Sequence, residues 1–505
     1  PNAEMEFVVK SEYISKGIEN QPSVMQIMEN GTFISNGQFM PGFGYNAGFE
    51  LSDKKDRKDN GLPEKDRMAK LTSIDCGEPC NNTYISSDAD WVKMEAVVST
   101  SADQIAIAPG SLVKEWEENG RKYFKYDLEQ PSLNFHNFVS ARFEVRRDKW
   151  NDSVDVEIYY HKPHEYNVDK MVESVKMSLD YYSQNFTPYK HKQARIIEFP
   201  RYATFAQAFP GTMPYSESIG FIANLENPDD IDFVTYVVAH EMAHQWWAHQ
   251  VIGGAVQGGT MLSESFSQYS ALMVMEKKYG RDQMKKFLKH EMDGYLRARG
   301  SERRNENPII YTENQQYIHY QKASVLFYAL RDFAGEDSVN KAMREFAQEF
   351  AYAEPSYPNT LQFMQYLEKH TPDSLQYLLT DMFHNITLYD NRALEASYKE
   401  LDSTHYEITL KVSASKLRAD STGTETEQPL NDWIDIGVYS PGFQNIEGKL
   451  IYKERKKLTD KENTFTFTVN QKPGKAGIDP DLLLIDRIPS DNMVKVDEEE
   501  EEKSE

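Results

Sequence analysis

The chain has 505 residues and a formal net charge of −24, from 56 basic and 80 acidic side chains. Its hydrophobic content of 39% is enough for several packed cores, and the length corresponds to about three domains. Such an acidic chain repels phosphate backbones and anionic lipids, so the composition argues against nucleic-acid binding.

The first third of the chain alternates apolar and polar residues, as at 92–98 and 154–160, which predicts β-strands. We therefore expect an N-terminal β domain over 1–161. Because the chain starts at Pro1 without an initiator Met, we expect this domain to be truncated at its start. Cys76 and Cys80 enclose only three residues and form either a small disulfide loop or two free thiols. A disulfide would indicate an oxidising compartment.

The middle of the chain carries apolar residues at helical spacing, as at 168–182 and 339–350, which predicts amphipathic helices in a domain over 162–394. The period returns to two from about residue 395, which predicts a C-terminal β-sandwich over 395–490. Seven of the last nine residues are acidic, so residues 491–505 are expected to form an acidic, disordered tail. No stretch approaches the roughly 18 apolar residues of a spanning helix. The predicted fold class is thus α+β and multidomain.

One motif in the middle domain has the spacing of a metal site. His240 and His244 lie four residues apart, and at about 100° per residue both imidazoles of a helix can reach one metal ion. Glu241 projects beside that metal, where it can take a proton from water without being a ligand. The ordinary alternative is a helix with two unrelated histidines.

Three further residues support the metal site. Glu264 begins the next helical stretch and can complete the ligand set. Tyr320 can donate a hydrogen bond to a developing oxyanion. Glu217 precedes the histidine pair, where a substrate-recognition strand would run. The alternative for Tyr320 is a core aromatic, and for Glu217 a salt-bridged loop carboxylate.

These segments, in this order, resemble the gluzincin zinc peptidases of the membrane alanyl aminopeptidase family, which also includes leukotriene A4 hydrolase. The resemblance is strongest over 200–335. It implies a thermolysin-like catalytic domain that binds one Zn²⁺, with a general base, an oxyanion donor and a glutamate that binds the free α-amine of a peptide. The matching residues are, for the metal, His240, His244 and Glu264, and for the other three roles Glu241, Tyr320 and Glu217.

The sequence departs from the family pattern at several positions. The family has 18 residues between the second His and the Glu, whereas 19 residues, 245–263, intervene here, and Ser263 occupies the family spacing. We expect the glycine-containing stretch before Glu264 to absorb the extra residue. In the recognition strand Pro214 replaces Gly and Ser218 replaces Asn, and Ala323 stands where Gly is usual after Tyr320.

A narrower resemblance concerns segments 295–297, 317–320 and 429–437, which are similar to peptidase domains fused to multi-spanning, ABC-2-type permease segments in bacteria. It implies a membrane-attached soluble domain, extracytoplasmic, whose partners are permease-like segments absent from this chain. No nucleic-acid partner is expected.

The predicted function is a zinc-dependent aminopeptidase that acts on peptides with a free N-terminus. Two alternatives stay open. One is a zinc endopeptidase, and the other is a catalytically silent, zinc-bearing interaction module of a transporter-like assembly, which the extra residue before Glu264 and the altered recognition strand motivate.

Overall fold

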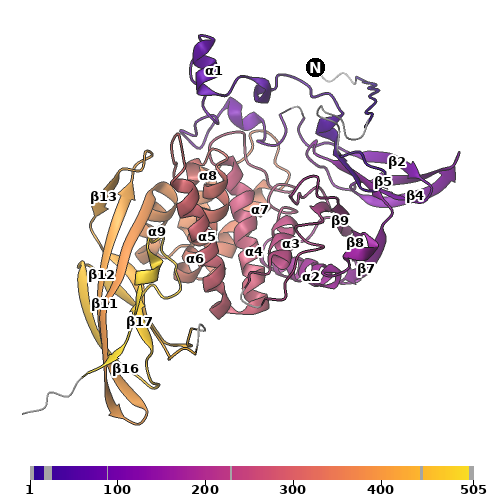
Figure 1. The fold of residues 1–505 in the computed structure, drawn as a ribbon. Coiled ribbons are helices and arrows are strands. Elements are labelled where there is room, and N and C mark those ends of the chain that lie inside the picture. Colours follow the sequence, from indigo (N-terminus) through magenta and orange to yellow (C-terminus); the bar gives the residue numbers. More distant parts are fainter. Residues whose placement is uncertain (1–4, 16–25, 88, 228–229, 444–446, 500–505) are drawn as a thin grey trace, which may run out of the picture. The chain divides into compact units, whose positions relative to one another are not determined.

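The computed structural model describes residues 5–15, 26–87, 89–227, 230–443 and 447–499 (Figure 1). The chain divides into two compact units. The first consists of Pro1–Lys278, Tyr311–Asn314 and Glu336–His370, and the second of Tyr279–Ile310, Gln315–Gly335 and Thr371–Glu505. The three-domain division made from the sequence stays a prediction.

Three sheets belong to the first unit. Two are antiparallel, with strand orders β1-β6-β3 and β2-β5-β4, and the third has the order β10-β9-β8-β7, in which β8, β9 and β10 run parallel. Their bounds are β1 Thr32–Ser35, β2 Glu95–Ser101, β3 Ile105–Ile107, β4 Ser111–Glu118, β5 Arg121–Asp127, β6 Asn137–Ala141, β7 Glu144–Trp150, β8 Val154–Tyr160, β9 Gln193–Phe199 and β10 Thr212–Ser216. Every residue of β9 and β10 is buried, as expected for parallel strands covered on both faces.

The α-helices of the first unit are α1 Lys54–Asp59, α2 Val168–Asn185, α3 Phe233–Ala243, α4 Glu264–Tyr279, α7 Glu336–Phe350 and α8 Thr360–His370. The helix predicted from the apolar period at 168–182 is α2, and its Met171, Val175 and Leu179 are fully buried. It packs against β7 and β8 on one side and against α3 on the other. The sheet therefore supports the helix that carries the histidine pair.

The second unit combines helices with the C-terminal sheets. Its α-helices are α5 Met284–Arg299, α6 Ala323–Ala334 and α9 Gln376–Leu379, with π-helices at Tyr317–Lys322 and Thr380–His384. One sheet has the order β13-β12-β11-β19, with β16 also paired to β12, and the other β15-β14-β17-β18. Their bounds are β11 Ile386–Asp402, β12 His405–Ala419, β13 Glu425–Gln428, β14 Asp432–Tyr439, β15 Leu450–Leu458, β16 Glu462–Val469, β17 Lys475–Ile478, β18 Met493–Lys495 and β19 Asp497–Glu498.

The two C-terminal sheets pack on each other through β11 and β17. N-terminal sheets, a helical middle and C-terminal sheets confirm the predicted α+β fold class. Among the described residues, no helix combines the length and the apolar character needed to cross a bilayer.

The predicted disordered tail over 491–505 is wrong for its first part. Residues 493–495 form β18, and β19 pairs in parallel with Ser397 and Tyr398 of β11. Val496 between them is buried, and the Tyr398 hydroxyl donates to Glu498 at 2.8 Å. Backbone pairing and one apolar anchor thus outweigh the local charge, while residues 500–505 lie outside the described part.

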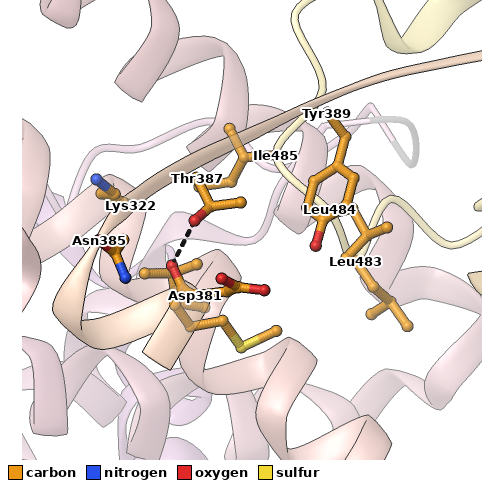
Figure 2. Close-up of a pocket in the computed structure, with 10 residues that line it drawn as sticks. Lys322, Asp381, Asn385, Thr387, Tyr389, Leu483, Leu484 and Ile485 are labelled. Atoms are coloured by element: carbon orange, nitrogen blue, oxygen red, sulfur yellow. Dashed lines mark hydrogen bonds between the residues drawn. The ribbon is translucent and has the colours of Figure 1, made fainter. Parts of the chain in front are cut away.

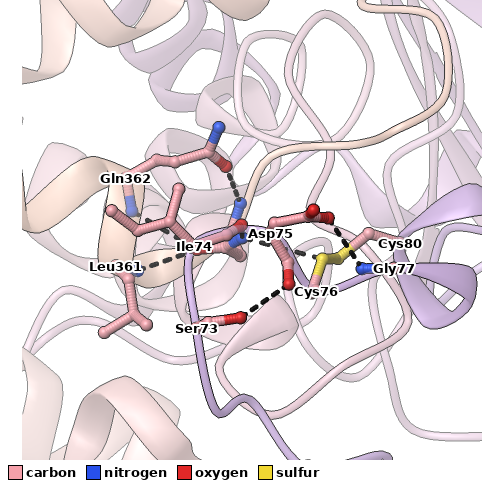
Figure 3. The surroundings of a disulfide bond; sticks show 9 residues. Ser73, Ile74, Asp75, Cys76, Gly77, Cys80, Leu361 and Gln362 are labelled. Atoms are coloured by element: carbon pink, nitrogen blue, oxygen red, sulfur yellow. Dashed lines mark hydrogen bonds between the residues drawn. A yellow bond between two sulfur atoms is a disulfide. The ribbon is translucent and has the colours of Figure 1, made fainter.

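Cys76 and Cys80 form a disulfide, which decides between the two options left by the sequence (Figure 3). Cys80 is fully buried, and its carbonyl accepts a hydrogen bond from the Tyr357 backbone at 2.7 Å. The Asn359 amide lies 3.7 Å from the Cys76 sulfur. The disulfide closes this loop, and these two contacts join the loop to the residues that precede α8.

The second unit contains a small cavity where its helical part meets β11 (Figure 2). The Thr387 hydroxyl donates to the carbonyl of Asp381 at 2.8 Å. The Asp381 carboxylate pairs with Lys416 at 2.9 Å and Arg418 at 2.8 Å. Because its charged group already has cationic partners, we assign this cavity a structural role.

Candidate metal centre

The predicted metal-binding helix is α3, and several contacts fix its position. Asp232 caps its first turn by accepting a hydrogen bond from the Thr235 backbone at 3.0 Å. The Tyr182 hydroxyl donates to the Ala239 carbonyl at 2.8 Å, and the Tyr215 hydroxyl to the Val237 carbonyl at 3.0 Å. The histidine-bearing turn is thus held by α2 and β10.

His240, His244 and Glu264 come together as predicted. The two Nε2 atoms lie 3.0 Å apart, and the Glu264 Oε2 atom lies 3.4 Å from His240 Nε2 and 3.3 Å from His244 Nε2. Both imidazoles are buried, and the Glu264 side chain is 18% exposed. Three ligand atoms of the types that zinc prefers therefore face one point.

The orientation of His244 is set by a backbone carbonyl. Its Nδ1 atom lies 2.9 Å from the carbonyl oxygen of Trp247. Because a carbonyl oxygen only accepts, Nδ1 carries the hydrogen, and in the neutral imidazole the lone pair of Nε2 points at the other two ligand atoms. The indole of Trp247 is itself fixed, since its Nε1 donates to Ser270 at 3.0 Å.

The attraction between the imidazoles and the Glu264 carboxylate shifts the pKa values of His244 and Glu264. Burial alone would lower the pKa of His244, but the charge and hydrogen bond of Glu264 raise it to about 9. Burial would raise the pKa of Glu264, but His244 and His240 hold it well below its usual range. The Glu264 carboxylate thus stabilises a positive charge between the two imidazoles. Either a proton or a metal ion can supply that charge.

The dimensions of the group fit a metal ion. A tetrahedral site with bonds of 2.0–2.1 Å has ligand atoms about 3.3 Å apart, and the three separations here are 3.0, 3.3 and 3.4 Å. The Glu264 Oε2 atom is buried, and the two imidazole nitrogens that face it lie at 3.3 and 3.4 Å, longer than most hydrogen bonds. A buried carboxylate oxygen that faces two imidazole nitrogens at these distances fits the third ligand of a metal ion.

Glu241 lies beside the group without belonging to it. Its side chain is buried, and the backbone N–H of Ala208 donates to its carboxylate. Burial raises its pKa, although the imidazoles of His240 and His244 oppose the rise. Its Oε2 atom is buried without a hydrogen-bond partner in the part of the chain described. One oxygen is thus held and the other is available to exchange a proton.

The extra residue before Glu264 does not displace the ligand. Helix α4 begins at Glu264, and Ser263 is turned to the Tyr84 hydroxyl, with which it shares a hydrogen bond. Tyr84 also lies close enough to Glu264 for that carboxylate to raise its pKa, after the larger effect of burial. Sequence reasoning missed Tyr84, because it lies 179 residues away and no local pattern links the two positions.

Glu217 falls in a second group of potential ligands, separate from the first. It follows β10, and its Oε1 atom lies 3.6 Å from Arg201 Nε, while its Oε2 atom lies 3.9 Å from His164 Nδ1. The sequence alternative of a salt-bridged carboxylate therefore describes its present contacts. Its role in amine binding stays a prediction.

Tyr320, His249 and His319 lie in different surroundings. Tyr320 lies in the π-helix of the second unit, so its predicted oxyanion role stays a prediction. His249 is buried and contacts the Ala208 carbonyl at 3.2 Å. His319 is buried beside the Tyr320 ring.

Known proteins share both the sequence pattern and the fold. Residues 166–383 match the Peptidase family M1 domain. Human endoplasmic reticulum aminopeptidase 2 is 26% identical over 182 residues, which are 34% of this chain and 19% of the relative. Rice aminopeptidase M1-B is 20% identical over 403 residues, 70% of this chain and 45% of the relative. The chain thus spans less than half of the length of these relatives.

Among solved structures, a crystal structure of Legionella pneumophila aminopeptidase A in complex with aspartic acid has the same fold. The TM-score is 0.51 at 15% identity, over 81% of this chain and 45% of that one. The family match encloses the histidine pair, Glu241 and Glu264. The predicted family resemblance is confirmed for this part of the chain, because residues 166–383 match the Peptidase family M1 domain.

Proposed function

We propose that the protein is a zinc-dependent aminopeptidase. The observation that carries the proposal is the triangle of His240 Nε2, His244 Nε2 and Glu264 Oε2, with sides of 3.0 to 3.4 Å, beside the buried carboxylate of Glu241. Three protein ligands leave a fourth position open, as in catalytic rather than structural zinc sites. The aminopeptidase names of the relatives support the substrate class.

The chemistry divides between the metal and the chain. When bound, zinc supplies Lewis acidity, which activates water and polarises the scissile carbonyl. Glu241 takes a proton from the attacking water through its free oxygen, while the Ala208 N–H holds the other oxygen. The same carboxylic acid then delivers the proton to the leaving amine. Burial raises the pKa of Glu241, which favours the protonated form that donates to the leaving amine.

Glu217 is proposed to bind the α-ammonium of the substrate, which restricts cleavage to the first peptide bond. Tyr320 is proposed to donate its hydroxyl to the oxyanion. The protein is further proposed to act as an extracytoplasmic domain attached to permease-like segments. The disulfide between Cys76 and Cys80 supports an oxidising compartment.

Glu241→Gln tests the proposal. The variant should keep one equivalent of zinc and lose about 10²–10⁴-fold in turnover of aminoacyl reporter substrates. Glu336→Gln, which changes a carboxylate bonded to the Tyr181 hydroxyl, is the control and should keep activity. Full activity in Glu241→Gln would remove the general base, and a zinc-loaded parent without any peptidase activity would favour the silent interaction module.

A second substitution separates the exopeptidase from the endopeptidase. Glu217→Ala should reduce hydrolysis of peptides with a free N-terminus far more than hydrolysis of N-acetylated peptides, because only the former carry the ammonium group. Equal losses on both substrates would contradict amine recognition and favour the endopeptidase.

A further inference from the structure

A second histidine–carboxylate group lies in the first unit, apart from the metal centre described above. The ligand atoms of His164, Glu198 and Glu217 lie within 4.8 Å of one another. His164 follows β8, Glu198 is the penultimate residue of β9, and Glu217 follows β10. These three strands are neighbours and run parallel, so their carboxyl ends meet at one edge. That edge is where open sheets with parallel strands commonly bind ligands.

Glu198 is the deepest member of the group. Its side chain is fully buried, and its Oε2 atom accepts a hydrogen bond from the His161 backbone at 2.6 Å. Its Oε1 atom contacts His164 Nδ1, which among the described residues is the only potential cation within 4.0 Å. A buried carboxylate is costly unless its charge is paired. Burial accordingly raises the pKa of Glu198.

The same imidazole faces a second carboxylate. Glu217 Oε2 lies 3.9 Å from His164 Nδ1. The one other cation near Glu217 in the described ranges is Arg201, at 3.6 Å, whose side chain is 68% exposed and therefore strongly screened by solvent. Two carboxylates thus share one imidazole. With both carboxylates ionised, the three side chains carry net negative charge whether that imidazole is neutral or protonated.

An independent observation comes from His161. Both of its ring nitrogens are buried, and neither has a hydrogen-bond partner within the described part of the chain. The ring stacks on Phe143, and its centroid lies 6.3 Å from that of His164. Buried polar groups without partners normally mark an ion or a water molecule that satisfies them.

We propose that His164, Glu198 and Glu217 bind one divalent transition-metal ion, as a second site beside the catalytic one. Imidazole and carboxylate together suit ions such as Mn²⁺, Co²⁺ and Zn²⁺. The ion supplies positive charge to the buried Glu198 carboxylate and the partly exposed Glu217 carboxylate, and it takes ligands from three strand ends at once. His161 lies at the rim of the group, where its nitrogens can contact water on the ion.

The first test counts metal ions on the full chain. Protein that holds one equivalent of Zn²⁺ is titrated with Co²⁺, followed by calorimetry and by visible absorption of the bound ion. The expected result is that the protein binds a second equivalent of metal ion, and that the visible absorption of this Co²⁺ is that of an ion with histidine and carboxylate ligands. Glu198→Gln should weaken this second equivalent at least about tenfold and leave the first unchanged. Binding of a single equivalent by the parent, or an unchanged second equivalent in Glu198→Gln, would overturn the proposal.

Two variants keep the test interpretable. Glu345→Gln is the matched control, because Glu345 also pairs with a histidine, His370, at 3.1 Å, but has Lys369 at 2.7 Å instead of a second carboxylate. It should keep both equivalents. If the buried Glu198→Gln does not fold, His164→Asn replaces it, since His164 is 25% exposed. Unchanged Co²⁺ binding in folded His164→Asn would likewise overturn the proposal.

A second test concerns the relation to catalysis, and this part rests on the proposed function. Because Glu217 is shared with the proposed amine site, an ion bound there should compete with peptides that carry a free N-terminus. Excess Co²⁺ should raise KM with little change in kcat, and Glu198→Gln should abolish this effect. A parent without peptidase activity would refute the proposed function but leave the ion count standing. Binding of an amino-acid amide but of no second ion would assign the group to substrate ammonium instead.

Discussion

The hydroxyl groups of Tyr84 and Ser263 share a hydrogen bond, although the two residues lie 179 positions apart in the sequence. Ser263 directly precedes Glu264, the first residue of α4 and the third member of the metal group. The segment that carries Tyr84 is held to the preceding loop by main-chain pairing, because Thr83 bridges to Gly254 and Ala255 donates to the Asn82 carbonyl at 2.8 Å. The N-terminal segment therefore contacts the residue from which α4 and its metal ligand follow.

Tyr84→Phe should weaken zinc binding by about tenfold, because the start of α4 loses the contact that orients Glu264. Chelator competition gives the affinity. Tyr357→Phe is the matched control, since Tyr357 packs in the same apolar cluster and its hydroxyl donates to Asp90 at 3.0 Å, away from α4. Equal losses of zinc affinity in the two variants would show that Tyr84 acts only through general stability.

Zinc binding should depend on pH through His244. Its pKa in the metal-free chain is about 9, so at lower pH an incoming zinc ion must displace a proton. The affinity should therefore fall about tenfold for each pH unit below 9, down to the pH at which further groups titrate. Calorimetry in buffers of different ionisation enthalpy should show close to one proton released at pH 7. Binding without proton release would contradict the prediction.

Tyr320→Phe should lower kcat by about 10²–10³-fold, because an oxyanion donor acts in the transition state rather than in substrate binding. Zinc content and KM should change little. Tyr317→Phe is the control within the same π-helix, where the Tyr317 hydroxyl donates to Glu302 at 3.1 Å. Steady-state kinetics on one aminoacyl substrate measures both variants. A rise in KM with unchanged kcat would show that Tyr320 acts in substrate binding only.

Removing the disulfide should lower the melting temperature. The cross-link between Cys76 and Cys80 restricts the unfolded chain, which for so short a loop is worth about 2 kcal/mol. Replacing both cysteines by Ala avoids leaving a free thiol at the buried Cys80. A reductant should lower the melting temperature of the parent toward that of the double variant and leave the variant unchanged. No difference between parent and variant would contradict the prediction.

The stability of the chain should also fall with rising pH because of Asp479. It is buried, its carboxylate accepts from the Leu483 and Leu484 backbones at 2.9 and 3.0 Å, and burial raises its pKa to about 7. The unfolded chain, with an ordinary pKa near 3.9, holds fewer protons between about pH 4 and 7. Stability from this group is therefore full below pH 4 and is lost as pH rises to 7, at up to about 1.4 kcal/mol per unit.

Asp479→Asn should flatten this dependence, because the amide does not titrate. Melting temperatures of parent and variant between pH 4.5 and 8 measure the effect. The parent should lose stability relative to the variant as the pH rises to about 7, and above that the two curves should run parallel. Parallel curves over the whole range would show that Asp479 keeps an ordinary pKa in the folded chain.

Short-range patterns in the sequence were sufficient for part of the site. The spacing of His240 and His244 fixes both imidazoles on one helical face, and the apolar period at 168–182 identifies α2, because helical geometry depends only on neighbouring residues. The alternation at 154–160 identifies β8 for the same reason. These features need no knowledge of the rest of the chain.

Other features arose only in the folded chain. Three contacts join segments that lie far apart in the sequence. Tyr84 bonds to Ser263, His164 and Glu198 meet at adjacent strand ends, and β19 pairs with β11. Their geometry depends on strand register and on the packing of whole elements, which local periodicity does not encode. The sequence by itself determined the chemical groups and their local faces, and the tertiary structure decided which of them meet, because contacts between distant segments follow from packing of the entire core.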